Sequence, residues 1–126
     1  MNKFGFEDLA VWKKAADLAA KVMDITENFE GKNKHYRLID QLESASTSIA
    51  LNIAEGKGRY SKKEFIHFLY IARGSLFETI SLLIILSKNG LIKDSQIEEI
   101  RIAASEIGKM ISGLINSLKL PTTYEL

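Results

Sequence analysis

The sequence predicts an all-α fold, an antiparallel up-down-up-down four-helix bundle. Four stretches of the 126-residue chain carry apolar residues at helical spacing, and none shows the alternation typical of a strand. The single proline, Pro121, lies near the C-terminus, where it ends a helix without breaking one. The expected loops are short, about four to seven residues, and short loops join antiparallel neighbours. We therefore expect one domain over residues 1–120 and a C-terminal tail at 121–126.

The first expected helix covers about residues 7–28. Its apolar residues step by four and three, and a second apolar stripe lies beside the first. Two adjacent stripes make a face wide enough to contact two neighbouring helices. The first stripe comprises Val11, Ala15, Leu18, Val22, Ile25 and Phe29, and the second comprises Leu9, Trp12, Ala16, Ala19 and Met23.

The second expected helix covers about residues 35–56, and its apolar stripe contains one polar residue, Asn52. Gly56 follows one turn later, as a residue that either permits close packing or ends the helix. The stripe comprises Leu38, Leu42, Ala45, Ile49, Asn52 and Gly56, supported by Ile39 and Ile53.

The third and fourth expected helices, about residues 61–89 and 95–118, each begin with an S-x-x-E capping box. Ser61 with Glu64 starts the third helix, and Ser95 with Glu98 starts the fourth. Gly90 is expected to adopt the left-handed conformation that stops the third helix. The apolar stripes are Phe65, Leu69, Ala72, Leu76, Ile80 and Leu83, and then Ile97, Ile100, Ala104, Ile107, Ile111, Leu114 and Leu118.

The composition is that of an ordinary soluble domain, with 46% hydrophobic and 26% charged residues. The absence of cysteine excludes disulfides and thiolate metal sites. The N-terminus has no apolar segment typical of a secretory signal, and the longest apolar run, SLLIILS, is too short to span a membrane. We therefore expect a cytoplasmic protein without a membrane partner. With a net charge of +1, any nucleic-acid binding must depend on a local basic patch.

Four polar residues, Asn52, Glu55, Ser75 and Glu78, lie on or beside the apolar faces of the second and third helices. The expected hairpin register places Asn52 near residue 66 and Ser75 near residue 44, so the two pairs form separate clusters within the hairpin. A buried Asn needs a hydrogen-bond partner. Asn52 is expected either to bond a backbone carbonyl or facing side chain and fix the helix register, or to meet a neighbouring subunit.

The densest positive cluster comprises Lys57, Arg59, Lys62 and Lys63. It is not a P-loop, because GKGR lies between two helices and not between a strand and a helix. The free N–H groups at the start of the third helix could bind an anion beside these cations. The alternative is a solvated loop that aids solubility. In a bundle the cluster lies at the same end as Lys3 and Lys119.

Enzymatic and metal-binding functions have little support in the sequence. Glu64 and His67 have the E-x-x-H spacing of di-iron bundles, but a second such pair is absent. No activated serine context occurs either. We expect no catalytic residue, no metal site and no cofactor.

Three segments resemble the small four-helix proteins encoded in intervening sequences of bacterial 23S ribosomal RNA genes. This family is related to the accessory protein of diversity-generating retroelements. The segments are FEDLAVWKKAADLA at 6–19, QLESASTSIALNIAEGKGRYSKKEF at 41–65 and FLYIARGSLFET at 68–79. The central segment is the most specific. Glu43 and Ser44 stand where many relatives carry basic residues.

The resemblance implies a four-helix bundle that assembles into a homo-oligomeric ring, often a pentamer, and has a role near nucleic acid. In the retroelement relatives a basic ring surface is thought to hold nucleic acid and a reverse transcriptase. A ring would give Asn52, Glu55, Ser75 and Glu78 partners across subunit interfaces. The leading hypothesis is a non-enzymatic homo-oligomeric scaffold that binds RNA or DNA through Lys57, Arg59, Lys62 and Lys63. The alternative is a protein-interaction module of a ring with no nucleic-acid role.

Overall fold

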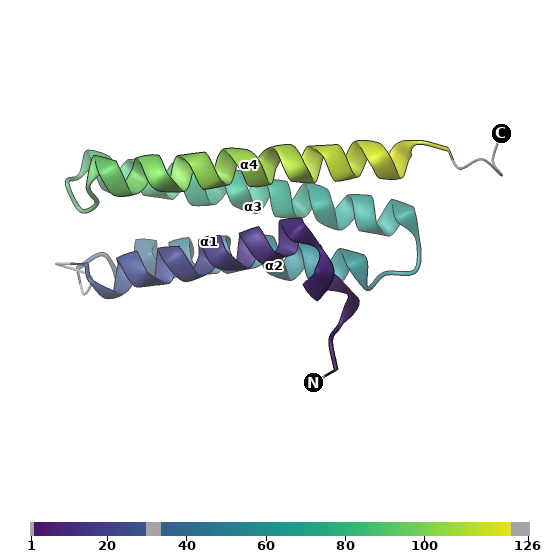
Figure 1. Cartoon of the computed structure of the whole chain (residues 1–126). Helices are drawn as coiled ribbons and strands as arrows, with labels where there is room; N and C mark the ends of the chain where they lie inside the picture. The colour runs from purple at the N-terminus through teal and green to yellow at the C-terminus, as the bar shows by residue number, and fades with distance from the viewer. Residues whose placement is uncertain (1, 30–33, 122–126) are drawn as a thin grey trace.

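The computed structural model describes residues 2–29 and 34–121, and these residues form four long α-helices, one short 3-10 helix and no strand. The 3-10 helix η1 covers Gly5–Asp8 and precedes α1. The long helices are α1 (Ala10–Glu27), α2 (Tyr36–Lys57), α3 (Lys62–Lys88) and α4 (Asp94–Lys119). Figure 1 shows them side by side, with the α2–α3 and α3–α4 connections at opposite ends of the bundle.

The helices are arranged so that each contacts two others. The contacting pairs are α1 with α2, α2 with α3, α3 with α4, and α4 with α1, whereas α1 and α3 face each other diagonally. This arrangement confirms the predicted all-α bundle. The expected tail at 121–126 lies outside the described residues except for Pro121, which is exposed.

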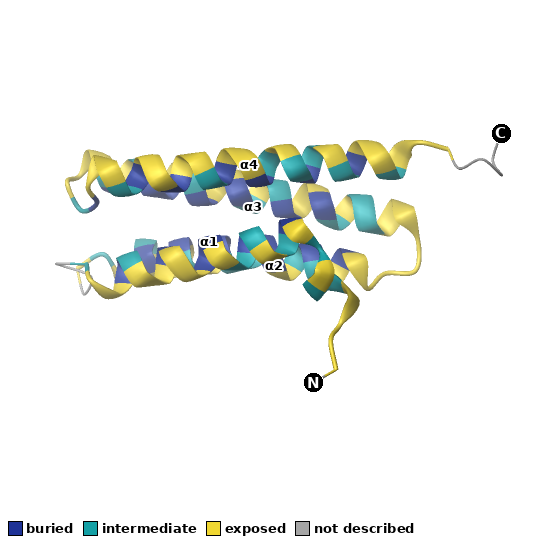
Figure 2. Ribbon diagram, viewed as in Figure 1, coloured by how far each residue is buried: buried dark blue, intermediate teal, exposed yellow. Residues whose placement is uncertain are grey.

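The core is built from the predicted stripes. One contiguous cluster of buried aliphatic residues joins all four helices, and Figure 2 shows the exposed residues on the outer sides of the helices. Leu18, Ile49, Leu69, Ile107 and Ile111 are among its fully buried members. Burial of aliphatic side chains is the main source of stability in such a bundle, at about 25 cal/mol for each Å² removed from water.

Helix ends agree with the sequence at two positions and differ at two others. The Ser61 hydroxyl accepts a hydrogen bond from the Glu64 N–H at 3.2 Å, as predicted for the start of α3. Gly90 has a φ of 76°, which confirms the left-handed residue after α3. The prediction that Ser95 caps α4 was wrong, because the helix begins one residue earlier, after Lys93. There Gln96 Oε1 accepts from the Lys93 N–H at 3.2 Å.

The first helix is shorter than predicted. Residues 5–8 form η1, and α1 starts only at Ala10, with Leu9 in an extended conformation between them. Glu7 holds this turn, because its Oε2 accepts a hydrogen bond from the Phe4 N–H at 2.7 Å. The break lets η1 pack against α2.

Gly56 has the close-packing role, not the helix-ending one. It is buried inside α2, which continues to Lys57. A Cβ at this position would lie 2.8 Å from the Phe68 Cβ and 2.9 Å from Phe65 Cδ1. Because real Cβ contacts are longer, α2 and α3 can approach this closely only with glycine at position 56.

Candidate functional site

Asn52 of α2 and Ser75 of α3 are connected through Ser48. The Asn52 side-chain amide donates to the Ser48 carbonyl oxygen at 2.8 Å and is 2.9 Å from its hydroxyl. The Ser48 hydroxyl lies 2.9 Å from the Ser75 hydroxyl across the hairpin. The expectation that Asn52 and Ser75 belong to separate clusters was therefore wrong. The hairpin register pairs Ser75 with Ser48, one turn from the expected Ser44.

The two carboxylates of this predicted set have different partners. Glu78 accepts from the Gln41 amide at 3.3 Å, further along the same seam between α2 and α3. Glu55 does not contact Gln41 or Glu78. It forms an ion pair at 2.5 Å with Arg59, four residues further along the chain. Three of the four predicted residues, Asn52, Ser75 and Glu78, thus take part in polar contacts along the α2–α3 seam. Glu55 instead pairs with Arg59 in the connection between α2 and α3.

The predicted basic cluster lies at the connection between α2 and α3. Lys57 is the last residue of α2, and Lys62 and Lys63 form the first turn of α3. All three are exposed, and none forms an ion pair with a carboxylate among the described residues. The free N–H groups of the first turn of α3 lie in the same segment and add partial positive charge there.

Arg59 is held against the protein. Besides its ion pair with Glu55, its guanidinium lies 4.7 Å from the centre of the Phe68 ring. Glu55 partly neutralises Arg59, so this residue offers less free charge than its three neighbours. Arg59 also lines a shallow hollow of about 560 Å³, together with Phe6, Leu51, Ala54, Glu55 and Gly58.

Tyr60 was missed by the reasoning from sequence. Its side chain is fully exposed at the tip of the loop, between Arg59 and the capping Ser61. An exposed aromatic ring among cations is the arrangement on which nucleic-acid bases stack. The signal was present in the sequence, because KGRYSKK interleaves an aromatic residue with a basic run.

Two further cations lie where α3 and α4 approach this end of the bundle. Lys119 donates to the Tyr70 hydroxyl at 2.8 Å, and the Arg73 guanidinium lies 4.9 Å from the Tyr70 ring centre. The hydrogen bond from Lys119 lowers the pKa of the Tyr70 phenol, and the positive charges of Lys119 and Arg73 act in the same direction. Lys119 is thus fixed by the protein at the end of α4.

The described residues contain no group of three His, Asp or Glu side chains placed to hold a metal ion. The Glu64 N–H is capped by Ser61, and the His67 ring packs at 5.5 Å against the Phe68 ring. At this E-x-x-H pair the Glu64 backbone thus takes part in helix capping and the His67 ring in aromatic packing.

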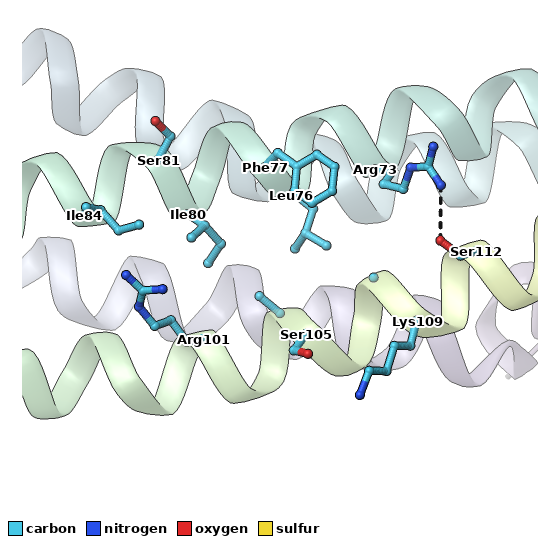
Figure 3. A pocket seen from close by; sticks show the side chains of 12 residues that line it. Arg73, Leu76, Phe77, Ile80, Ser81, Ile84, Arg101, Ser105, Lys109 and Ser112 are labelled. Atoms are coloured by element: carbon cyan, nitrogen blue, oxygen red, sulfur yellow. Dashed lines mark hydrogen bonds between the residues drawn. The ribbon is translucent and has the colours of Figure 1, made fainter.

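A groove between α3 and α4 was also not foreseen from the sequence. Its volume is about 940 Å³, and apolar residues alternate along it with serines and three cations (Figure 3). Phe77 stands beside it with 65% of its surface exposed, and the Arg73 Nη1 atom donates to the Ser112 hydroxyl at 3.2 Å across one end. The lining residues are Arg73, Leu76, Phe77, Ile80, Ser81, Ile84, Arg101, Ala104, Ser105, Gly108, Lys109 and Ser112.

The outer side of α3 is also apolar. Among the described helices, α3 alone is long and apolar enough to cross a membrane by length and composition, and 39% of its most apolar window is buried. Its buried side packs against α2 and α4. Its exposed large apolar residues are Tyr70, Ile71, Phe77 and Ile85.

Both a family model and solved structures match this chain. A family model described as 23S rRNA-intervening sequence protein matches residues 7–113. A crystal structure from Bacteroides thetaiotaomicron VPI-5482, described as a protein with unknown function from the S23 ribosomal protein family, is similar with a TM-score of 0.77. The two chains are 27% identical, and the match covers 84% of this chain and 95% of that chain. No curated protein matches.

Proposed function

The chain belongs to the family of 23S rRNA-intervening sequence proteins, and from this premise we propose that it is a non-enzymatic, homo-oligomeric scaffold that binds RNA or DNA. Membership confirms the resemblance seen in the sequence. The proposed contact surface is the basic loop, which we define as Lys57, Arg59, Tyr60, Lys62 and Lys63. The observation that carries the proposal is the fully exposed Tyr60 ring among these cations.

The geometry of the basic loop supports contact with phosphates and with unpaired bases. Lys57, Lys62 and Lys63 are exposed and form no ion pair with a carboxylate among the described residues, so each can reach a phosphate oxygen without first breaking an ion pair. The N–H groups of Lys62 and Lys63 at the start of α3 can donate hydrogen bonds to an anion. Tyr60 offers a flat apolar surface for a base, and a stacked base contributes about 1–3 kcal/mol.

Assembly would multiply these contacts. One chain has a net charge of only +1, and one loop neutralises few phosphates. Non-specific affinity depends steeply on the number of phosphates contacted at once. Several basic loops carried on one homo-oligomer would therefore bind one nucleic acid far more tightly than a single loop.

Fluorescence anisotropy of labelled nucleic acid tests the proposal. Structured RNA, single-stranded RNA and duplex DNA are titrated with the protein at several salt concentrations. We expect affinity to fall steeply as salt rises, because bound phosphates release counterions. Replacing Lys57, Lys62 and Lys63 by glutamate should abolish binding while the helical content by circular dichroism stays unchanged.

Lys88→Glu with Lys93→Glu is the control for Lys62→Glu with Lys63→Glu, which reverses the same number of charges within the basic loop. Lys88 and Lys93 are exposed and lie at the opposite end of the bundle, where α3 meets α4. This control should retain most of the affinity. Absence of binding by the unmodified protein even at low salt, or binding that survives reversal of the basic loop, would contradict the proposal.

The alternative function is a protein-interaction module without a nucleic-acid partner, such as a protein that works beside a reverse transcriptase. The groove between α3 and α4 is the observation in its favour, because its lining is more apolar than a phosphate-binding surface needs to be. Recovery of one stoichiometric protein from nuclease-treated lysate, together with no binding in the anisotropy titration, would favour this alternative.

A further inference from the structure

The half of the α3–α4 pair that adjoins the basic loop carries cations and no acid. Residues 65–77 of α3 and 107–119 of α4 contain no aspartate or glutamate, and their basic side chains are Arg73, Lys109 and Lys119. Figure 1 shows the end of α4 at the same end of the bundle as the connection between α2 and α3. This half of the surface therefore extends the positive charge of the basic loop.

The nearest acids act on the charges further along the groove. Glu78 accepts a hydrogen bond from α2, and Glu106 pairs with a lysine of α1. Glu98 and Glu106 also share a hollow along α4 with Arg101 and Lys109, so these two cations have acids beside them. The positive charge that no neighbouring acid offsets is thus concentrated at the end of the groove nearest the basic loop.

Two cations at that end are held in place by one aromatic ring. The Lys119 Nζ atom lies 2.8 Å from the Tyr70 hydroxyl, and the Arg73 guanidinium lies 4.9 Å from the Tyr70 ring centre. Arg73 also donates to the Ser112 hydroxyl at 3.2 Å. Neither cation forms an ion pair with a carboxylate in the part of the chain that the structure describes. A phosphate group is the kind of anion that such fixed cations bind.

Beyond Arg73 the groove offers an exposed ring above an apolar floor. Phe77 lies one turn further along α3 with 65% of its surface exposed, and Leu76 and Ile80 lie next to it in the groove lining (Figure 3). Gly108 of α4 leaves the floor shallow, since a Cβ there would already lie 3.4 Å from the Leu76 side chain. A planar ligand could therefore stack on the Phe77 ring and cover the apolar floor.

The rim of the groove is polar without being acidic. The hydroxyls of Ser81, Ser105 and Ser112 belong to the lining, and each can donate or accept a hydrogen bond. The groove volume, about 940 Å³, is that of a small-molecule site. A nucleotide has a planar base, polar base edges and a phosphate, which match the ring, the hydroxyls and the cations in turn. A hydrocarbon chain would match the apolar floor alone.

An exposed strip of α3 connects the basic loop with the groove. Lys63, Tyr70 and Phe77 follow one another at intervals of seven residues, so they lie on one side of the helix, and all three are exposed. Gly74 lies between the two rings, and nothing stands within 4 Å of its Cβ position. The distance along α3 from Lys63 to Phe77 is about 21 Å at 1.5 Å per residue. At about 3.4 Å per stacked nucleotide, about six nucleotides of one strand span it.

We infer that a single strand of RNA or DNA bound at the basic loop continues along this side of α3 and places an unpaired base on Phe77 in the α3–α4 groove. A phosphate beside that base contacts Arg73 and Lys119. A duplex cannot fill the groove, because its bases are paired and stacked. The inference rests on the proposed function and deepens it, since it names single strands as the preferred ligand and assigns a second contact.

Removing the ring tests the stacking. Phe77→Ala should weaken binding of a single-stranded oligonucleotide of about ten nucleotides at least about fivefold in the anisotropy titration, with duplex binding unchanged. Phe77→Tyr should retain the affinity, because a ring remains. Ile85→Ala is the matched control, since Ile85 is an exposed apolar residue of α3 that is not part of the groove lining. It should leave both affinities unchanged.

Removing the cation tests the phosphate contact. Arg73→Gln should reduce the slope of log affinity against log salt by about 0.7 for single strands, as expected for one lost phosphate. Arg101→Gln is the matched control, because it removes the same charge from the other end of the groove. Its salt dependence should equal that of the unmodified protein. Circular dichroism should show the same helical content for all these variants.

The length of the strand gives a third measurement. Affinity should rise stepwise once the strand reaches about six nucleotides, because it then contacts both the basic loop and the groove. Phe77→Ala should lose this step and keep the affinity for a trinucleotide, which reaches the basic loop alone. A step that persists in Phe77→Ala would contradict the second contact.

The possible results separate this inference from the proposed function. Single-strand binding that depends on the basic loop but is unchanged in Phe77→Ala and Arg73→Gln overturns the inference and leaves the proposed function standing. Absence of binding to any nucleic acid overturns both. If Phe77→Ala abolishes recovery of a stoichiometric protein from nuclease-treated lysate and leaves single-strand affinity unchanged, the groove binds a protein and the inference is wrong.

Discussion

The hydroxyl of Ser48 on α2 lies 2.9 Å from the hydroxyl of Ser75 on α3, and this contact sets the polar register of the central hairpin. Asn52, the polar residue that stands out in the apolar stripe of α2, bonds only within its own helix, to Ser48. The link between the helices is therefore made by a serine that the sequence pattern does not distinguish.

Replacing Ser48 by alanine should destabilise the protein by about 0.5–1.5 kcal/mol, the usual net worth of one hydrogen bond. The Asn52 amide keeps its bond to the Ser48 carbonyl oxygen, which limits the loss. Urea unfolding of Ser48→Ala, Ser75→Ala and the double variant measures the coupling between the hydroxyls. Additive changes in the free energy of unfolding would show that the contact contributes nothing.

Gly56→Ala should destabilise the protein by about 1–3 kcal/mol, because overpacking forces α2 and α3 apart. The added Cβ would lie within 3 Å of Phe65 and Phe68. Gly74→Ala is the control in α3, where an added Cβ meets nothing within 4 Å. That variant should gain about 0.5–1 kcal/mol, since alanine is the better helix former. Equal effects in thermal unfolding would disprove the close-packing role.

Tyr60→Ser should weaken binding of single-stranded RNA about fivefold or more, since a stacked base contributes about 1–3 kcal/mol. The salt dependence of binding should stay the same, because no positive charge is removed. Lys62→Gln should instead reduce the slope of log affinity against log salt by about one, as expected for one lost phosphate contact. Anisotropy titrations distinguish the two effects. An unchanged affinity for Tyr60→Ser would exclude base stacking on this ring.

Tyr70 should ionise at a lower pH than an ordinary tyrosine. Its hydrogen bond from Lys119 lowers the pKa in the folded state, whereas the unfolded value is about 10. The phenolate is thus favoured in the folded protein, so this group adds stability as pH rises from its folded pKa to its unfolded pKa. The contribution disappears as pH falls through the folded pKa.

An absorbance titration near the phenolate band, taken as the difference between the unmodified protein and Tyr70→Phe, measures the pKa of Tyr70. Lys119→Met should raise that pKa toward the ordinary value, and Lys109→Met is the control with the same loss of charge. A pKa that does not respond to the loss of Lys119 would contradict the hydrogen bond.

The fold could be predicted from the sequence because the core of a helical bundle depends mainly on the periodic spacing of apolar residues. Residues such as Leu18, Ile49 and Ile107 recur at helical spacing, and any bundle that buries them satisfies the pattern. The hairpin register was one turn off, because periodicity does not record the close approach at Gly56. The prediction that Ser95 caps α4 was wrong because the S-x-x-E pattern fits residues 95–98, although α4 already begins at Asp94. The pattern alone does not determine which residue precedes the helix.

The candidate site was predicted only in part. Lysines that are close in sequence and flank one loop are also close in space. The structure accordingly places Lys57, Lys62 and Lys63 together at the connection between α2 and α3, as predicted. The groove was not predictable in the same way. Arg73 and Arg101 belong to different helices, and their sharing of one groove depends on how α3 and α4 pack.

The two ion pairs between α1 and α4 have a consequence for folding. Every other contact between two long helices joins neighbours in the sequence, whereas the Lys14–Glu106 and Lys21–Glu99 pairs join α1 and α4, which are farthest apart in the sequence. Both pairs are well exposed, so they contribute little to hold this seam. Contacts distant in sequence form late, so we expect the α2–α3 hairpin to nucleate folding and the α1–α4 seam to close last. The backbone amides of α1 should then exchange with solvent sooner than those of α3.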